Sequence, residues 1–162
     1  MRVLRSFPPV VGRAPRVLIL GSMPGPEALR RGQYYGFPGN HFWRLAAGVL
    51  GRPEPGEYRA RLAMLRRGGV ALWDVLAACR RRGALDGAIR APRPNDIPAL
   101  LRRHPTLKAV FVNGRAAQGY LRRFHGAGVK VPVQYLPSSS PANARGGFGV
   151  KLGRWMTIRR WL

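Results

Sequence analysis

Cysteine and clustered histidine are almost absent from this sequence of 162 residues. Its single cysteine, Cys79, excludes an intramolecular disulfide and any metal or iron–sulfur site made of cysteines alone. The histidines, His41, His104 and His125, lack the spacing of metal ligands. We therefore expect no metal, no iron–sulfur cluster and no other cofactor. Cys79 is expected to be a buried filler in the helix or turn after a strand.

Long apolar runs are missing as well. No stretch approaches the roughly 18 to 20 residues that a membrane-spanning helix requires. Arg2 and Arg5 lie at the N-terminus, but Pro8, Pro9 and Arg13 interrupt the segment that follows, unlike in a signal peptide. We expect a cytoplasmic protein, nucleoid-associated if prokaryotic, that does not bind a membrane.

Acidic residues are scarce, with 6 Asp and Glu against 29 Lys and Arg, and the formal net charge is +23. A field of one sign and this size favours a polyanionic partner, because binding phosphates releases condensed counterions. An Arg-rich genome or adaptation to heat is the alternative explanation. The charge does not distinguish an RNA-binding protein from an enzyme that acts on DNA.

What the sequence does contain is an alternation of strand-like and helix-like segments. The apolar, partly β-branched stretches typical of buried strands are residues 16–21, 69–73, 107–113 and 131–136. The stretches with helical spacing are residues 40–50, 58–66, 96–103, 114–124 and about 153–161. This order predicts an α/β fold, a three-layer α/β/α sandwich with a central, mainly parallel four-stranded sheet.

No repeat or linker divides the chain, so we expect a single domain over residues 1–162, with residues 1–14 as a loosely ordered N-terminal extension. Asn95 is a candidate N-cap, with Pro98 in the first helical turn. Ligands of such sheets bind beyond the carboxyl ends of the strands. Function should therefore lie in residues 22–26, 74–76, 114–116 and 137–147.

Residues 33–43 (QYYGFPGNHFW) combine five aromatic side chains with two amides and a histidine. Core packing explains Phe42 and Trp43, but it explains the polar side chains of this Gly- and Pro-broken loop poorly. Asn40 could simply cap the following helix. Aromatic rings beside amides instead suit a pocket that stacks an extruded base and contacts its edge.

These motifs together resemble the uracil-DNA glycosylase superfamily, and most closely its hypoxanthine-DNA (deoxyinosine) glycosylases, often called family 6. The likeness spans roughly residues 15–160, and its motifs stand at the ends of successive predicted strands. The segments that carry it are residues 21–25 (GSMPG), 33–36 (QYYG), 38–43 (PGNHFW), 69–76 (GVALWDVL) and 136–143 (LPSSSPAN).

Two positions depart from the wider superfamily. Met23 stands where mismatch-specific uracil enzymes have the asparagine that places the attacking water, and Leu136 stands where many relatives have a histidine that stabilises the departing base. The resemblance to the hypoxanthine branch implies instead that Asn40 is the catalytic residue. An amide has no useful pKa, so Asn40 would hold a water below the anomeric carbon rather than act as a general base.

The resemblance also implies a set of residues that bind the base. Asp74 ends a predicted buried strand where relatives have an amide that contacts the base edge, and as a carboxylate it would accept the N1–H of hypoxanthine. If buried, it could instead titrate upward and become a donor. A helix N-cap or an arginine salt bridge is the alternative. Phe42 would stack on the base, and Met23, Gln33 and Ser22 would surround it.

Residues expected to contact the DNA backbone or to fill the gap left by the extruded nucleotide are Ser138, Ser139, Ser140, Asn143, Arg145 and Arg115. No lysine lies in the motifs, so a Schiff-base lyase is not indicated and a monofunctional enzyme is expected. The other acidic residues, among them Asp86, are expected to be solvated surface groups. We expect a monomer.

Three functions remain as hypotheses. The first is a DNA-repair glycosylase that flips out and excises a deaminated base, most specifically hypoxanthine from deoxyinosine, with uracil or a broad set of deaminated bases as the alternative substrate. The second is a non-catalytic, basic nucleic-acid-binding module. The third, a small nucleotide hydrolase, has little support because the sequence lacks a carboxylate cluster for metal.

Overall fold

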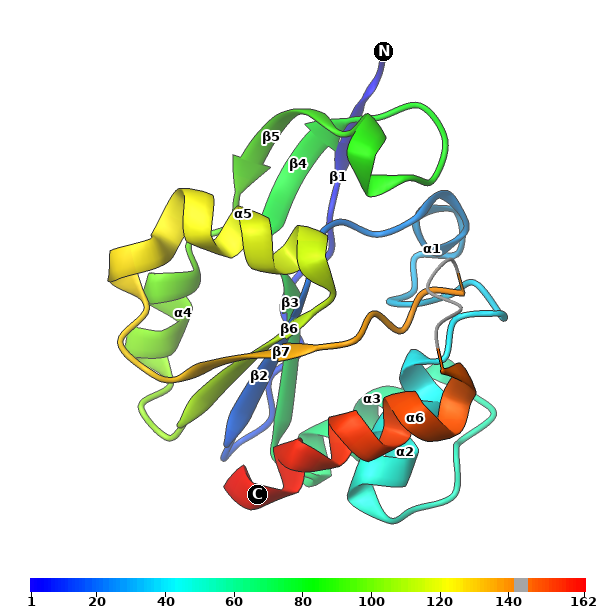
Figure 1. Cartoon of the computed structure of the whole chain (residues 1–162), viewed down its shortest axis with the longest axis vertical. Coiled ribbons are helices and arrows are strands. Elements are labelled where there is room, and N and C mark those ends of the chain that lie inside the picture. The colour runs from blue at the N-terminus through cyan, green and yellow to red at the C-terminus, as the bar shows by residue number, and fades with distance from the viewer. Residues whose placement is uncertain (142–145) are drawn as a thin grey trace.

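The computed structural model describes residues 1–141 and 146–162 and has a parallel sheet at its centre (Figure 1). The order of the strands in this sheet is β3-β2-β6-β7, and each neighbouring pair is parallel. The bounds of the strands are β2 Val17–Gly21, β3 Val70–Asp74, β6 Ala109–Asn113 and β7 Val133–Leu136. All four lie within the apolar stretches predicted from sequence or extend one by a single residue.

Helices cover both faces of this sheet, which confirms the predicted three-layer sandwich (Figure 1). In β2, Val17 and Ile19 pack in one core with helices α2, α3 and α6, and Leu18 and Leu20 pack in the other with α4 and α5. Burial on both faces explains why the strand is apolar throughout. The helix bounds are α1 Pro26–Arg31, α2 Phe42–Leu50, α3 Tyr58–Arg67, α4 Ile97–Arg103, α5 Arg115–His125 and α6 Gly147–Trp155.

A second, three-stranded antiparallel sheet was not predicted. Its order is β1-β4-β5, with bounds Val3–Arg5, Leu76–Arg80 and Arg90–Pro94. Cys79 is indeed buried, but the expectation of a helix or turn was wrong, because it lies on β4 opposite Leu4. This small sheet follows β3 after one residue, so it stands directly beyond the carboxyl edge of the central sheet (Figure 1).

The N-terminal segment differs from the loosely ordered extension that we expected. Strand β1 pairs with β4, and Val10 exchanges two backbone hydrogen bonds with Leu72 of β3, at 2.8 and 2.9 Å. The indole Nε1 of Trp73 also donates to the carbonyl of Phe7 at 3.1 Å. These pairings join residues about 70 positions apart, so local sequence patterns do not reveal them.

The helix ends also refine the prediction. Asp96, not Asn95, caps α4 by accepting the N–H of Ala99, while Asn95 donates through Nδ2 to the carbonyl of Asp74. Pro98 lies in the first turn, as expected. Short 3₁₀ helices occupy Asp86–Ala88, Gly126–Gly128 and Met156–Trp161. Within the described ranges, no helix has the length and apolar character needed to cross a membrane.

Candidate active site

Three neighbouring strands of the central sheet end at polar or small residues that face one cavity. Gly21 ends β2 beside Asp74 at the end of β3, and Asn113 ends β6 on the other side of β2. The cavity has a volume of about 790 Å³. The site residues predicted from sequence that line it are Ser22, Met23, Asn40, Asp74, Arg115, Ser138, Ser139 and Ser140.

Asp74 is a buried acid at the base of this cavity, with 3% of its surface exposed. Its Oδ2 atom is buried and has no hydrogen-bond partner in the described part of the chain. Burial raises the pKa of this carboxyl from 3.8 to about 7, and the charge of Asp86 adds to the effect. A large fraction of Asp74 therefore carries a proton at neutral pH.

Tyr35, rather than Phe42, lines the cavity. The two rings are stacked, with centroids 4.0 Å apart and planes 10° apart, and Phe42 lies behind Tyr35 with no exposed surface. The expectation that Phe42 contacts a ligand directly is therefore wrong in this structure. Phe42 packs edge to face against Trp43 and Trp155 and so supports Tyr35 from the core.

The backbone and hydroxyl of Tyr35 are both unusual. Its φ of 52° lies in the left-handed region, where non-glycine residues are strained and where such strain often marks functional sites. Its Oη accepts a hydrogen bond from Asn113 Nδ2 at 3.1 Å. Burial, followed by the charge of Asp74, raises the pKa of this hydroxyl, so it stays protonated and can donate.

Asn40 both caps a helix and faces the cavity. Its Oδ1 accepts the backbone N–H of Phe42 at 2.9 Å, which fixes the amide at the start of α2. The capping role that we weighed as an alternative is thus real, but it does not exclude a catalytic one. A carbonyl oxygen has two lone pairs, so Oδ1 can accept a water as well as the Phe42 amide.

Asn113 was not predicted as a site residue, yet it joins Tyr35 to the loop that contains Ser139. Its Oδ1 accepts the N–H of Ser139, and its Nδ2 donates to the Ser139 hydroxyl, both at 2.9 Å. Ser139 is buried and positions its loop, and its expected contact with a phosphate stays a prediction. The carbonyl of Ser139 accepts the N–H of His41, which ties this loop to the start of α2.

A buried lysine contacts the loop that contains Ser139 and Ser140. Lys151 of α6 donates through Nζ to the carbonyl of Ser140 at 3.2 Å and lies 3.5 Å from Nδ1 of His41. Burial lowers the pKa of Lys151. Burial and the charges of Lys151 and Arg44 lower the pKa of His41. No local sequence pattern indicates this lysine, because 110 positions separate it from His41.

The loop after β2 is attached to the small sheet. The hydroxyl of Ser22 donates to Oδ1 of Asp86 at 2.8 Å, and Met23 is buried in the cavity wall. Asp86 itself lines the cavity, so its assignment to the solvated surface was incomplete. The hairpin between β4 and β5 carries it there, and this hairpin was missing from the predicted fold.

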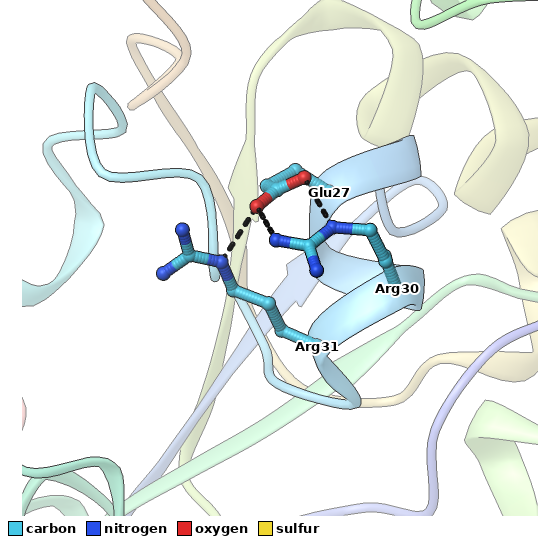
Figure 2. Close-up of polar contacts among 3 residues, drawn as sticks. All are labelled: Glu27, Arg30 and Arg31. Atoms are coloured by element: carbon cyan, nitrogen blue, oxygen red, sulfur yellow. Dashed lines mark hydrogen bonds and ion pairs between the residues drawn. The ribbon is translucent and has the colours of Figure 1, made fainter.

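Glu27 is the acidic residue on the outer wall of the cavity, and two arginines neutralise it (Figure 2). Arg30 donates to both carboxylate oxygens, at 2.5 and 2.9 Å, and Arg31 donates at 2.7 Å. Hydrogen bonds from Arg30 and then from Arg31 lower the pKa of Glu27 to about 2. This cluster keeps a net positive charge at the rim, which suits an anionic ligand.

The remaining predicted site residues lie in different places. Gln33 is absent from the cavity wall, and its backbone instead takes part in the turn after α1. Arg115 is exposed at the start of α5 and lines the cavity. Asn143 and Arg145 lie outside the described residues. In the part of the chain that is described, no group of three or more His, Cys, Asp or Glu residues could hold a metal ion.

Comparisons with known proteins agree with this geometry. The sequence profile of the Uracil DNA glycosylase superfamily matches residues 8–154. A hypoxanthine DNA glycosylase of Methanosarcina acetivorans is 40% identical over 144 residues, 88% of this chain and 90% of that protein. A hypoxanthine DNA glycosylase of Methanosarcina barkeri is 39% identical over 142 residues, 87% and 89% of the two chains. A solution NMR structure of a Methanosarcina acetivorans protein assigned to the uracil DNA glycosylases aligns with a TM-score of 0.84 and 36% identity, over 98% of both chains.

Proposed function

Since the chain belongs to the uracil DNA glycosylase superfamily, we propose that it is a monofunctional DNA glycosylase that excises hypoxanthine from deoxyinosine. The observation that carries this proposal is the convergence of Asn40, Tyr35 and Asp74 on one cavity at the carboxyl edge of the sheet. The relatives described above act on hypoxanthine according to their names, and about 40% identity over most of both chains supports the same substrate here.

The edge of hypoxanthine matches a protonated Asp74. The base presents a donor at N1–H next to an acceptor at O6, and a carboxylic acid presents an acceptor next to a donor. Two hydrogen bonds can therefore form between the two groups. Adenine has the opposite pattern, an acceptor at N1 and a donor at N6, and an acid whose proton can lie on either oxygen can pair with both bases, so Asp74 alone does not distinguish adenine from its deamination product.

The proposed reaction is hydrolysis of the N-glycosidic bond. A water held by Asn40 Oδ1 attacks the anomeric carbon as the bond to the base nitrogen breaks, and the electron pair leaves with the base. The hydroxyl stays on the sugar, the water's proton passes to solvent, and the departing base takes up a proton. A hydrogen bond from protonated Asp74 to O6 strengthens as negative charge develops on the base, which lowers the barrier. This bond compensates for Leu136, which cannot stabilise the leaving group.

Tyr35 and the joined loops complete the proposed site. The ring of Tyr35, supported by Phe42, provides a flat surface against which an extruded base can stack. Ser138, Ser140 and Arg115 are on the cavity wall where the flanking phosphates of an extruded nucleotide would pass. One chain supplies all of these groups, and we propose that the enzyme acts as a cytoplasmic monomer on damaged DNA.

The test is a base-release assay across lesions. Duplexes labelled on one strand and carrying inosine, uracil, xanthine or no lesion are incubated with the protein, and abasic sites are then cleaved with alkali. We expect strand cleavage at inosine above all other bases. Equal cleavage at uracil would instead support the broad deaminated-base alternative, which shares the same donor–acceptor edge. Binding of nucleic acid without release of any base would contradict the proposal.

A further inference from the structure

The hairpin between β4 and β5 reaches from the small sheet to the rim of the cavity. Residues 82–87 at its tip are exposed, and Ala84, Leu85 and Asp86 line the cavity. Two contacts fix the hairpin to the loop after β2. Asp86 accepts the Ser22 hydroxyl, and buried Arg81 donates to the carbonyl of Pro24 at 2.6 Å. The tip is therefore held beside the opening of the cavity.

Leu85 is the most exposed large apolar side chain among the described residues, at 70%. A single exposed leucine is ordinary on a protein surface. This one differs because its chain neighbour Asp86 is anchored to the cavity wall, so an apolar side chain is held at the point where a substrate must enter. Phe37 and Tyr135, which also line the cavity, are exposed as well, at 48% and 38%. The rim is thus apolar at several points.

The stem of the hairpin presents arginines on one face. Leu4 and Cys79 are paired and lie in one apolar cluster, whereas Arg80 next to Cys79 is exposed, and bulges interrupt the register of β4 with β5 on either side of Ala78. In register, Arg80 lies opposite Arg90, and Ala78 lies between Arg5 and Arg93. The outer face therefore carries four exposed arginines, which are Arg5, Arg80, Arg90 and Arg93.

This arrangement is unfavourable without an anionic partner. Like charges directly opposite in an antiparallel sheet destabilise it. The ion pairs found in the described residues involve Glu27 and Glu54, and none includes these four arginines. Arg90 donates through Nη1 to the carbonyls of Gly87 and Ile89 at 2.9 Å, which keeps its guanidinium near the tip.

We propose that the β4–β5 hairpin is a DNA-binding arm, with Leu85 entering the base stack beside the extruded nucleotide and the arginines of its outer face binding backbone phosphates. This inference rests on the proposed function, and it names a surface that the cavity alone does not include. An extruded base leaves a gap in the duplex, and an apolar side chain that fills the gap slows its return. Phosphate contacts along the stem hold the duplex in register with the tip.

The role of Leu85 is tested by comparing duplex and single-stranded substrates. Leu85→Ala should lower kcat/KM for inosine in a duplex about tenfold, and it should leave kcat/KM for single-stranded inosine unchanged, because a single strand has no stack to fill. Leu85→Met should restore most of the duplex activity. Val133→Ala, at an exposed apolar residue where β7 begins, is the matched control and should behave as wild type. Equal losses on both substrates, or no loss, would overturn this role.

The role of the arginines is tested by binding to an undamaged duplex at several salt concentrations. Neutralising Arg80 and Arg90 as R80Q/R90Q should reduce the slope of log K against log salt by about 2, or about 1 for each phosphate contact. The control R102Q/R103Q removes two exposed arginines at the end of α4, which precedes β6 and so lies at the opposite edge of the sheet. Its slope should change less.

These measurements separate the two proposals. Binding to an undamaged duplex requires no base release, so a smaller slope for R80Q/R90Q alone would support the arm even if no lesion were excised. In that case only the proposed glycosylase activity would fail. If inosine is excised normally and both arginine pairs change the slope equally, the arm is contradicted while the proposed function stands.

Discussion

Asp74 is the residue whose chemistry changes most between sequence and structure. The sequence alone predicts either a carboxylate that accepts N1–H or, if the residue is buried, a protonated acid that can donate. Burial raises its pKa to about 7, and Oδ2 is without a partner among the described residues. The protonated acid can contact both N1–H and O6, whereas the ionised form can accept only from N1–H and repels the negative charge that develops on the leaving base.

We therefore expect excision of hypoxanthine to weaken as pH rises through about 7. Asp74→Asn presents an amide donor and acceptor at every pH, so its rate should stay nearly constant from about pH 6 to pH 8.5, since an amide does not titrate in this range. Single-turnover rates for a deoxyinosine duplex measure both profiles. A wild-type rate that rises across this range, or a folded but inactive Asp74→Asn, would contradict the assignment.

The same substitution has a separate effect on stability. The unfolded chain ionises Asp74 near its ordinary pKa of 3.8, but the folded chain keeps the proton up to about 7. This residue therefore weakens the fold progressively as pH rises between those values, and the penalty is constant above them. Asp74→Asn should raise the free energy of unfolding by up to about 4 kcal/mol at pH 8 and by little at pH 4. Urea titrations at both pH values provide the measurement.

Asn40 has two roles that substitution can separate. Asn40→Ala removes the cap on Phe42 N–H and should lower the free energy of unfolding by about 1 kcal/mol. The loss of the group that holds water should reduce single-turnover excision about 100- to 1000-fold. Asn40→Ser keeps a capping oxygen, so it should restore stability but not activity. If Asn40→Ser were as active as wild type, the amide would not be catalytic.

At the scale of single elements, the ends of β2 and β3 determine how closely the catalytic groups approach. A Cβ added to Gly21 would lie 2.5 Å from Asp74 Oδ1 and 2.7 Å from Tyr35 Oη, both too close for a real contact. Gly21→Ala should displace one of these groups and lower kcat/KM about 100-fold, as an active-site shift of about 1 Å does elsewhere. Gly119→Ala is the control, because nothing lies within 4 Å of an added Cβ on this exposed helix position. Wild-type activity in Gly21→Ala would show that the two groups need not converge.

The sequence predicted the bounds of an element well where the apolar pattern of that element alone reflects its burial. The strands of the central sheet were predicted closely because both faces of β2, β3 and β6 are covered, which makes them apolar throughout. The last helix was predicted to begin near residue 153 but begins at Gly147, because its first turn contains glycines and little apolar periodicity. The helix α1 was missed for a related reason, since it is short and begins after a proline-rich turn.

The sequence was uninformative where pairing joins distant segments. Strands β1, β4 and β5 carry arginines and prolines on an exposed face, so their patterns do not resemble a buried strand. The sequence also predicted that Phe42 faces the cavity, where the structure has Tyr35, and the cause is similar. Which ring faces a ligand depends on a left-handed backbone conformation at Tyr35, and sequence spacing does not specify it.

At the scale of the whole molecule, positive charge is in large excess. The protein has 29 basic side chains and 6 acidic ones, and in the described residues the ion pairs use only Glu27 and Glu54 among the acids. Most arginines therefore remain available to an external polyanion. The charge does not specify a site, but the cavity and the small sheet that carries exposed arginines both lie beyond the carboxyl edge of the central sheet.

The N-terminal segment connects these two parts of the molecule. Residues 3–5 pair with the small sheet, Val10 pairs with the central sheet, and the segment between them binds side chains beside the cavity. Tyr34, which lines the cavity, donates through its hydroxyl to the carbonyl of Pro8 at 2.7 Å, and Trp73 donates to Phe7. Deleting residues 1–11 would remove all of these contacts at once.

We expect this deletion to lower the free energy of unfolding by about 4 kcal/mol, at about 1 kcal/mol for each of the two Val10 backbone bonds and the Trp73 and Tyr34 bonds. The corresponding fall in Tm is about 10 °C for a chain of this size, measured by calorimetry. Deleting residues 1–2 alone is the control, because β1 begins at Val3. Equal Tm values for the two deletions would mean that the segment only rests on the surface. A lower Tm for the longer deletion, together with weaker excision of inosine at temperatures below that Tm, would mean that the segment holds the cavity wall in place.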